Sequence, residues 1–315
     1  MRSFAKEVKE EILMNERTDP QFKAELSGLL QFLSTISISN RGLTIVIRTE
    51  NAKISRFVMA LLKEYYGAVI ETSIVRKMKL NKNKVYLLRV MNKGREILED
   101  LGLWTEEGLM SHPSRAFVNN REMARAYLAG CFLASGSVND PKKTDYHMEI
   151  STNREEQGKF ILRALKKLGL NGKMIPRRNQ FVVYIKSVDA INDFLVHIGA
   201  NDCAIQYADV RIQRDIYNNY TRLENCATAN EVKMIRSGKE QVDAIERLKR
   251  SGKFDKLDRK LKETAELRLR YPEESLQALS EYYEEETGQA ISKSGMKHRL
   301  EKIVELSGIN AERGE

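Results

Sequence analysis

The residues best suited to recognise a polyanion lie near the carboxyl end of the chain. Ser292 fits a helix N-cap, and the residues after it have helical periodicity. Met296, Leu300 and Ile303 fall within about 60° of one another, so they should face a small core. Residues on the other side could meet the base edges of a DNA duplex, and flanking cations its phosphates. The predicted DNA contacts of this helix are Ser292, Lys293, Ser294, Lys297, His298, Arg299 and Lys302.

Two further helices are predicted just before this one. Residues 257–270 form a helix that ends at Tyr271-Pro272, and Ser275 begins the next. The glutamate-rich segment Tyr283–Ala290 predicts a loop longer and more acidic than the usual turn, unless a helix extends into it. Its negative charge should keep it away from phosphates. The succession resembles the helix-turn-helix of the promoter-reading C-terminal domain of sigma factors.

A second set of cations lies on predicted β-hairpins and loops in the first two-thirds of the chain. Such charges attract phosphates without reading sequence. The alternative is that they are solvated residues that protect exposed strands from aggregation. The predicted contacts are Arg76, Lys77, Lys79, Lys82 and Lys84 in the first part, and Lys142, Lys143, Arg177 and Arg178 in the second.

The elements that position these cations occur twice along the chain. Each copy predicts the order αββαββα, and a four-stranded sheet covered by helices on one face buries that pattern. We therefore predict an α+β fold, with two pseudo-symmetric αββαββα halves followed by an all-α helix-turn-helix domain. Four landmarks recur about one hundred residues later: Leu26–Leu30 as Leu128–Phe132, Phe57–Met59 as Phe160–Leu162, Leu62-Lys63 as Leu165-Lys166, and Tyr86 as Tyr184.

The predicted domain boundaries follow the loss of β-type patterning. From about Asp209 the strand signals vanish, and residues 210–250 predict a long helix in which Gly238 is a candidate break. The predicted domains are residues 1–104 for the first half with its N-terminal helix, 105–120 for a connection, 121–208 for the second half, 209–252 for a helical linker and 253–315 for the DNA-binding domain.

Each copy carries a glycine inside a predicted helix, Gly28 and Gly130. Glycine costs about 1 kcal/mol relative to alanine in a helix, so we expect these two to allow close approach of the paired helices. The segment Leu128–Gly136 resembles the LAGLIDADG helix of homing endonucleases, and Leu26–Ser34 is a more degenerate copy. The resemblance implies that each helix ends in an acidic residue that holds a divalent metal for DNA cleavage.

The positions that match those acidic residues are Leu33 and Ser135. Neither can hold Mg²⁺, which prefers carboxylate oxygens. Glu25 lies two turns away and Asp140 lies in a predicted loop, and we expect both to be solvated surface charges. The sequence thus predicts no catalytic residue, metal site or cofactor.

Composition sets broader bounds. The formal net charge of +9 favours a polyanionic partner. Cys131, Cys203 and Cys226 are scattered, which fits neither a disulfide framework nor a zinc site and is typical of a reducing cytoplasm. The first residues lack the apolar core of a signal peptide, and no apolar run reaches the length of a membrane span. We therefore expect a soluble cytoplasmic protein with neither a membrane nor a small-molecule substrate as partner.

A degenerate nuclease body joined to a sigma-like helix-turn-helix resembles the WhiA family of bacterial regulators over essentially the whole chain. This resemblance implies a nucleoid-associated, DNA-binding regulator of transcription, cell division and chromosome segregation that binds promoter regions, with sporulation as one setting. Two alternatives stay open: a residual endonuclease, and a module that docks on a sigma factor or RNA polymerase. The matching segments are Ser3–Ala5, Tyr127–Gly130, Gly136–Asn139, Asn225–Asn230 and Ile291–Gly295.

Overall fold

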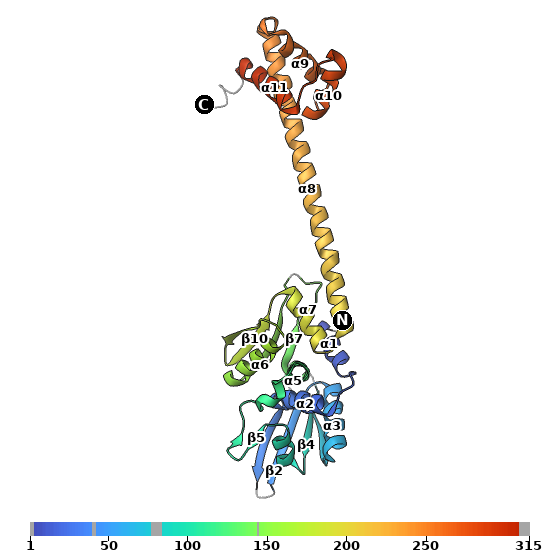
Figure 1. Cartoon of the computed structure of the whole chain (residues 1–315), viewed down its shortest axis with the longest axis vertical. Helices are drawn as coiled ribbons and strands as arrows, with labels where there is room; N and C mark the ends of the chain where they lie inside the picture. Colours follow the sequence, from blue (N-terminus) through green and yellow to red (C-terminus); the bar gives the residue numbers. More distant parts are fainter. Residues whose placement is uncertain (1–2, 40–41, 77–83, 144, 309–315) are drawn as a thin grey trace. The chain divides into compact units, whose positions relative to one another are not determined.

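The computed structural model describes residues 3–39, 42–76, 84–143 and 145–308. It divides into two compact units, Met1–Arg214 and Asp215–Glu315 (Figure 1). The first contains two four-stranded sheets, and the regular elements in the described part of the second are all helices. We describe each unit by itself.

The first unit has the repeated order of elements that the sequence predicts. Helix α1 (Phe4–Ile12) precedes both copies and buries Phe4, Val8 and Ile12. The first copy comprises α2 (Asp19–Leu33), β1 (Ser34–Ser39), β2 (Gly42–Thr49), α3 (Ala52–Tyr66), β3 (Ile70–Arg76), β4 (Lys84–Val90) and α4 (Gly94–Asp100). The second comprises α5 (Arg121–Ser135), β7 (Gly136–Val138), β8 (Met148–Thr152), α6 (Glu155–Lys167), β9 (Lys173–Arg177), β10 (Gln180–Ile185) and α7 (Val188–His197).

The two sheets have the same topology, β1-β2-β4-β3 and β7-β8-β10-β9, with every neighbouring pair antiparallel. Alternate strand residues such as Leu88, Val90, Ile150 and Val183 are buried, and this pattern leaves the other face of each sheet partly exposed. We call that second face the open face. The predicted α+β fold with two pseudo-symmetric αββαββα halves is confirmed.

Helices α2 and α5 cross at the centre of the unit, and the two glycines lie at the crossing. A Cβ atom on Gly28 would lie 2.4 Å from the carbonyl oxygen of Tyr127. A Cβ on Gly130 would lie 2.0 Å from the carbonyl oxygen of Glu25. Since real Cβ atoms do not approach so closely, only glycine permits this backbone contact. The side chain of Gln31 adds a polar bridge between the halves by accepting a 2.8 Å hydrogen bond from Tyr127 Oη.

The segment between the halves, which the sequence predicts as a connection, contains regular secondary structure. It contains a short hairpin of β5 (Trp104–Thr105) and β6 (Gly108–Leu109), followed by the 3₁₀ helix η1 (Arg115–Val118). Phe117 of η1 is buried in the core of the first unit. A hydrophobic anchor therefore fixes this segment to the unit.

The helix that follows the second half, α8 (Asn201–Arg250), begins about eight residues earlier than predicted and has no break at Gly238. Its first turn is capped by the Glu11 carboxylate, which accepts from the amides of Asp202 and Cys203 at 2.7 and 3.0 Å. Gly238 instead serves a close contact, because a Cβ there would lie 2.3 Å from the carbonyl oxygen of Pro272. The predicted break was wrong because a helical glycine can signal packing as well as an end.

The second unit has a compact helical core. After the 3₁₀ helix η2 (Phe254–Lys256) come α9 (Arg259–Arg270), α10 (Leu276–Thr287) and α11 (Lys293–Ser307). Helix α10 extends through the acidic residues to Gly288, which ends it in a left-handed conformation (φ 68°). The long loop from Tyr283 is thus wrong, the alternative that a helix extends into this segment is confirmed, and the turn is short. The core is formed by Ile245, Leu248, Leu261, Ala265, Leu267, Leu279, Tyr283, Met296, Leu300 and Ile303.

Candidate nucleic-acid interface

Helix α11 exposes the face that the sequence assigns to DNA. Met296, Leu300 and Ile303 are fully buried against the core. The Oγ of Ser292 accepts a hydrogen bond from the Gly295 amide at 3.1 Å, which caps the helix. No acidic residue lies in the first turn, so the positive end of the helix dipole adds to the nearby lysines. Among the predicted contacts the exposed ones are Ser292, Lys293, Ser294, Lys297, His298 and Lys302.

The positive charge of α11 is concentrated toward its amino end. Lys302 forms an ion pair with Glu305 at 2.8 Å, and Lys297 lies 3.5 Å from Glu301. Both pairs are exposed, so each is worth little to stability and can be exchanged for a phosphate contact. The ion pair of Lys302 is shorter than that of Lys297, and Lys302 lies further from the first turn of the helix. The geometry therefore favours Lys293 and Lys297 as the main phosphate contacts.

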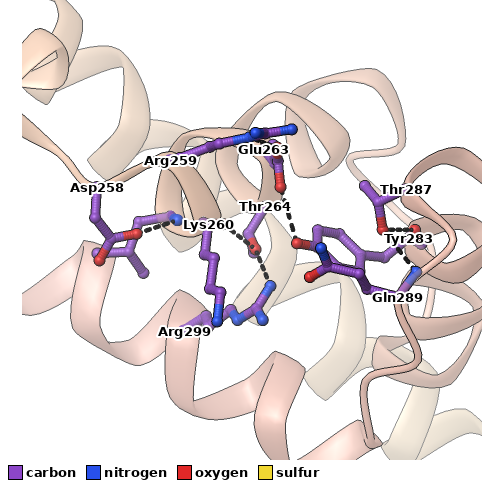
Figure 2. Close-up of polar contacts among 10 residues, drawn as sticks. Asp258, Arg259, Lys260, Glu263, Thr264, Tyr283, Thr287, Gln289 and Arg299 are labelled. Atoms are coloured by element: carbon purple, nitrogen blue, oxygen red, sulfur yellow. Dashed lines mark hydrogen bonds and ion pairs between the residues drawn. The ribbon is translucent and has the colours of Figure 1, made fainter.

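Arg299 differs from its neighbours because it packs within the second unit. Figure 2 shows its guanidinium between α9 and α10, 3.4 Å from the Thr264 hydroxyl and 4.8 Å from the centre of the Tyr283 ring. Tyr283 in turn donates to Glu263 at 2.9 Å. A cation stacked on a tyrosine and half-buried in this way positions α11 on the other helices.

The acidic part of α10 lies outside the core. Glu281, Glu284, Glu285 and Glu286 are all exposed, and Glu286 forms an ion pair with Arg270. The carboxylates that remain would repel a phosphate backbone. A DNA duplex on α11 must therefore leave this acidic surface in solvent.

In the first half, the described cations of the hairpin do not lie on the open face. Arg76 and Lys84 face each other in the β3–β4 register, on the side that carries Leu88. The open side of the same hairpin carries Val75 and Val85. This arrangement gives the first sheet an apolar open face near β3 and β4. The other predicted contacts of this hairpin, Lys77, Lys79 and Lys82, lie outside the described residues.

The open face of the second sheet is cationic and aromatic. Lys173 is paired in register with Tyr184, and Arg177 lies further along the same face of β9. The Lys186 ammonium lies 5.6 Å from the centre of the Tyr184 ring. The His147 ring stacks on Tyr184 at a centroid distance of 5.7 Å. Exposed cations interleaved with aromatic rings are typical of nucleic-acid-binding surfaces.

One carboxylate lies on this cationic face. Glu149 is paired with Tyr184 across the strands, 2.9 Å from His147 Nε2 and 3.8 Å from Arg177 Nη1. The neighbouring cation partly offsets its charge. The sequence did not single out Lys186 or His147 as contacts, although the period of two along β10 places Lys186 beside Tyr184.

Three predicted cations of the second half lie in turns. Lys142 and Lys143 are exposed in the loop between β7 and β8, and Arg178 occupies the β9–β10 turn with φ 55°. The loop is held to α8, because Arg214 donates to the carbonyl oxygen of Lys143 at 2.8 Å and to Tyr146 Oη at 2.9 Å. These cations therefore lie at the margin of the second sheet.

The predicted equivalence of Tyr86 and Tyr184 is wrong. Tyr86 shares its side of the first sheet with the buried Leu88, whereas Tyr184 lies on the open face of the second. Strand side chains alternate, so an offset that differs by an odd number of residues places a matched pair on opposite faces. The aromatic part of the cationic face is thus specific to the second half.

The two helix ends that would carry metal ligands in a LAGLIDADG nuclease lack carboxylates. Helix α2 ends at Leu33 and α5 at Ser135, whose Oγ donates to the carbonyl oxygen of Ser151 at 2.5 Å. Asp140 caps its own loop by accepting from the Lys142 amide. Within the described ranges, no group of three His, Cys, Asp or Glu residues could hold a metal ion.

Glu25 is not the solvated surface charge that the sequence predicted. Its side chain is 3% exposed and forms an ion pair with Arg17, with 2.9 Å between Nη2 and Oε1. Burial raises the pKa of the Glu25 carboxyl, and the hydrogen bond from Arg17 opposes that rise. The burial of Glu25 has a local cause, since the segment before α2 folds Arg17 back over the start of the helix.

Models of three protein domains match the chain. They are the WhiA N-terminal LAGLIDADG-like domain at residues 20–104, the WhiA LAGLIDADG-like domain at 124–217 and the WhiA C-terminal HTH domain at 220–307. A protein of Bacillus cytotoxicus named "Probable cell division protein WhiA" is 40% identical over 306 residues, which cover 97% of this chain and 96% of that protein. The chain belongs to the WhiA family.

Other WhiA proteins agree in sequence and fold. One from Enterococcus faecalis, with the same name, is 39% identical over 305 residues, which cover 97% of each chain. The crystal structure of a full-length WhiA from Thermatoga maritima covers 97% of this chain and 98% of its own, with a TM-score of 0.61 and 24% identity. That structure supports the fold alone. In the described part of the chain, no helix combines the length and apolar character needed to cross a bilayer.

Proposed function

We propose that this WhiA protein is a non-catalytic DNA-binding regulator of transcription in bacterial cell division. The observation that carries the proposal is α11, which presents Lys293, Lys297 and His298 from a capped helix end on a well-packed helical core. Recognition helices place such an amino end in the major groove, which supports the proposal. The name shared by its relatives supports the role in division.

The finer parts of the proposal concern the target and the body. We propose promoter regions of the bacterial nucleoid in the cytoplasm as the target, with chromosome segregation and sporulation as processes it affects. The cationic open face of the second sheet supports a further, sequence-independent contact to DNA. Leu33 and Ser135 at the helix ends support a body that binds DNA without cleaving it.

The first test replaces the two phosphate contacts of α11. Lys293→Ala together with Lys297→Ala should weaken binding to every DNA sequence. It should also make the negative slope of log K against log salt shallower by about 1.8, because each lost phosphate contact removes about 0.9 from its magnitude. Fluorescence anisotropy with a labelled duplex at several salt concentrations measures both quantities. An unchanged slope would remove α11 from the proposed interface.

Lys302→Ala is the control for this pair, since Lys302 is an exposed lysine of the same helix that lies further from its amino end and has the shorter ion pair. We expect a slope change of less than about half a unit for this variant. Arg299→Ala should behave differently again. Because its guanidinium packs on Tyr283, its loss should lower the melting temperature of the second unit along with the affinity.

His298→Ala tests sequence reading. The imidazole is exposed on the outward face of α11, where it can reach base edges. We expect the variant to relax the preference at one or two base pairs of a site selected from random DNA, by about 1–3 kcal/mol at each. Binding of the variant to single-base variants of that site measures the change. Equal losses on all of them would show that His298 contributes only general affinity.

A further inference from the structure

A pocket of about 790 Å³ opens beside the apolar part of the first sheet. Its floor is formed by the ends of the paired helices, at Leu33 and Leu133, and its wall by Val85 and Leu87 on the open face of β4. Lys9 reaches it from α1. The volume lies within the range of small-molecule sites, which are mostly apolar and have a few polar groups that fix the ligand.

The cation in this pocket has an unusual environment. The Lys9 ammonium lies 5.7 Å from the centre of the Phe132 ring and is half-buried. Desolvation lowers the pKa of this amine to about 8. A half-buried ammonium has lost part of its hydration, so an anion in the pocket would gain a strong charge pair with it.

The carboxylates next to Lys9 on α1 are engaged elsewhere. Glu10 forms an ion pair with Lys53 at 2.7 Å, and Glu11 caps the first turn of α8. No ion pair joins Lys9 to a carboxylate of the described residues. Glu50 lines the pocket as well but has a partner of its own. The anion that would neutralise Lys9 must therefore come from outside these residues.

We propose that this pocket binds a small apolar carboxylic acid, whose carboxylate pairs with Lys9 and whose hydrocarbon body covers Leu33, Val85 and Leu87. Arg48, which is paired in register with Leu87, lies at the exposed side of the pocket and adds a second positive charge. The apolar wall argues against a DNA phosphate as the occupant, because phosphates prefer hydrated, polar surroundings. This site is separate from α11 and does not depend on the proposed function.

Three probes of equal chain length separate the contributions of charge and apolar area. Octanoate, octanol and octylamine are titrated into the full-length protein by isothermal calorimetry and by methyl NMR. We expect octanoate to bind at one saturable site, octanol at least tenfold more weakly, and octylamine without saturation. Equal affinities for octanoate and octanol, or no saturable binding of octanoate, would overturn the proposal.

Variants of Lys9 connect this preference to one side chain. Lys9→Met should reduce the affinity for octanoate at least tenfold and leave that for octanol unchanged, whereas Lys9→Arg should retain part of the preference. Lys186→Met makes the same change on the second sheet and should have no effect on either probe. Octanoate binding that survives Lys9→Met would assign the acid to another site and refute the proposal. Methionine is easier to bury than an ammonium, so the variant should remain folded.

Discussion

Gly130→Ala is expected to destabilise the first unit by about 3 kcal/mol, at the upper end of the usual cost of overpacking. Alanine would normally stabilise a helix by about 1 kcal/mol relative to glycine, so the substitution has two opposing effects. Here the steric effect dominates, because the added Cβ would lie 2.0 Å from the backbone oxygen of Glu25. A backbone atom cannot rotate away as a side chain can, so α2 and α5 must separate along their length. Gly28→Ala should act in the same direction, since its Cβ would lie 2.4 Å from the Tyr127 oxygen.

Urea unfolding monitored by the fluorescence of Trp104 measures this loss, because the chain has one tryptophan and it lies in the first unit. Ala126→Ser adds one heavy atom to the same helix, at a half-buried position that lines a polar pocket. We expect that control to change the unfolding free energy by less than about 1 kcal/mol. If Gly130→Ala were as stable as this control, the close approach of the two helices would be wrong.

Local signals were enough to predict most elements of the fold. In α3, Asn51 caps the helix by accepting from the amides of Lys53 and Ile54, and Gly67 ends it with φ 60°. Both residues act within one turn of the helix they bound, so their effect can be read from the sequence. The duplication added a second constraint, because an element recognised in one half predicted its equivalent in the other.

The faces of the strands could not be predicted as well. Arg76 and Lys84 were predicted as DNA contacts of this hairpin, and that contact stays a prediction; the sequence did not show that they share the side of buried Leu88. The face is hard to predict because one residue of register reverses the face of every side chain. The hydrophobic alternation of β4 is weak, with Val85, Tyr86 and Leu87 all half-buried, so the sequence alone does not decide the register.

Charged residues with distant partners were a second source of error. Glu25 was expected in solvent but pairs with Arg17. Arg299 was predicted to contact phosphate, which stays a prediction, and the sequence did not show that it stacks on Tyr283 of another helix. Charged side chains are exposed in most cases, and only the folded chain shows which of them has found a partner. For α11 the prediction worked better, because helical periodicity separates the buried Met296 and Leu300 from the outward residues.

Arg268→Met is expected to destabilise the second unit by about 3 kcal/mol, because buried carbonyl groups left without a donor cost about 1–3 kcal/mol each. The Arg268 side chain is 2% exposed, and its Nη1 lies within hydrogen-bonding distance of the carbonyl oxygens of Tyr271, Pro272 and Glu274 at 3.1, 3.3 and 2.8 Å. These carbonyls belong to the segment that joins α9 to α10. Methionine fills a similar volume but leaves the carbonyl groups without this donor.

The effect should extend to DNA binding, because the same segment also contacts α8. The Pro272 carbonyl lies against Gly238, so its displacement loosens the packing of α8 on the helix-turn-helix core. Amide hydrogen exchange of α9, α10 and α11 in the full-length protein should accelerate roughly a hundredfold or more. Arg270→Met removes an exposed arginine two residues away that pairs with Glu286, and should change exchange little. Equal protection in both variants would show that the buried guanidinium does not hold the recognition helix in place.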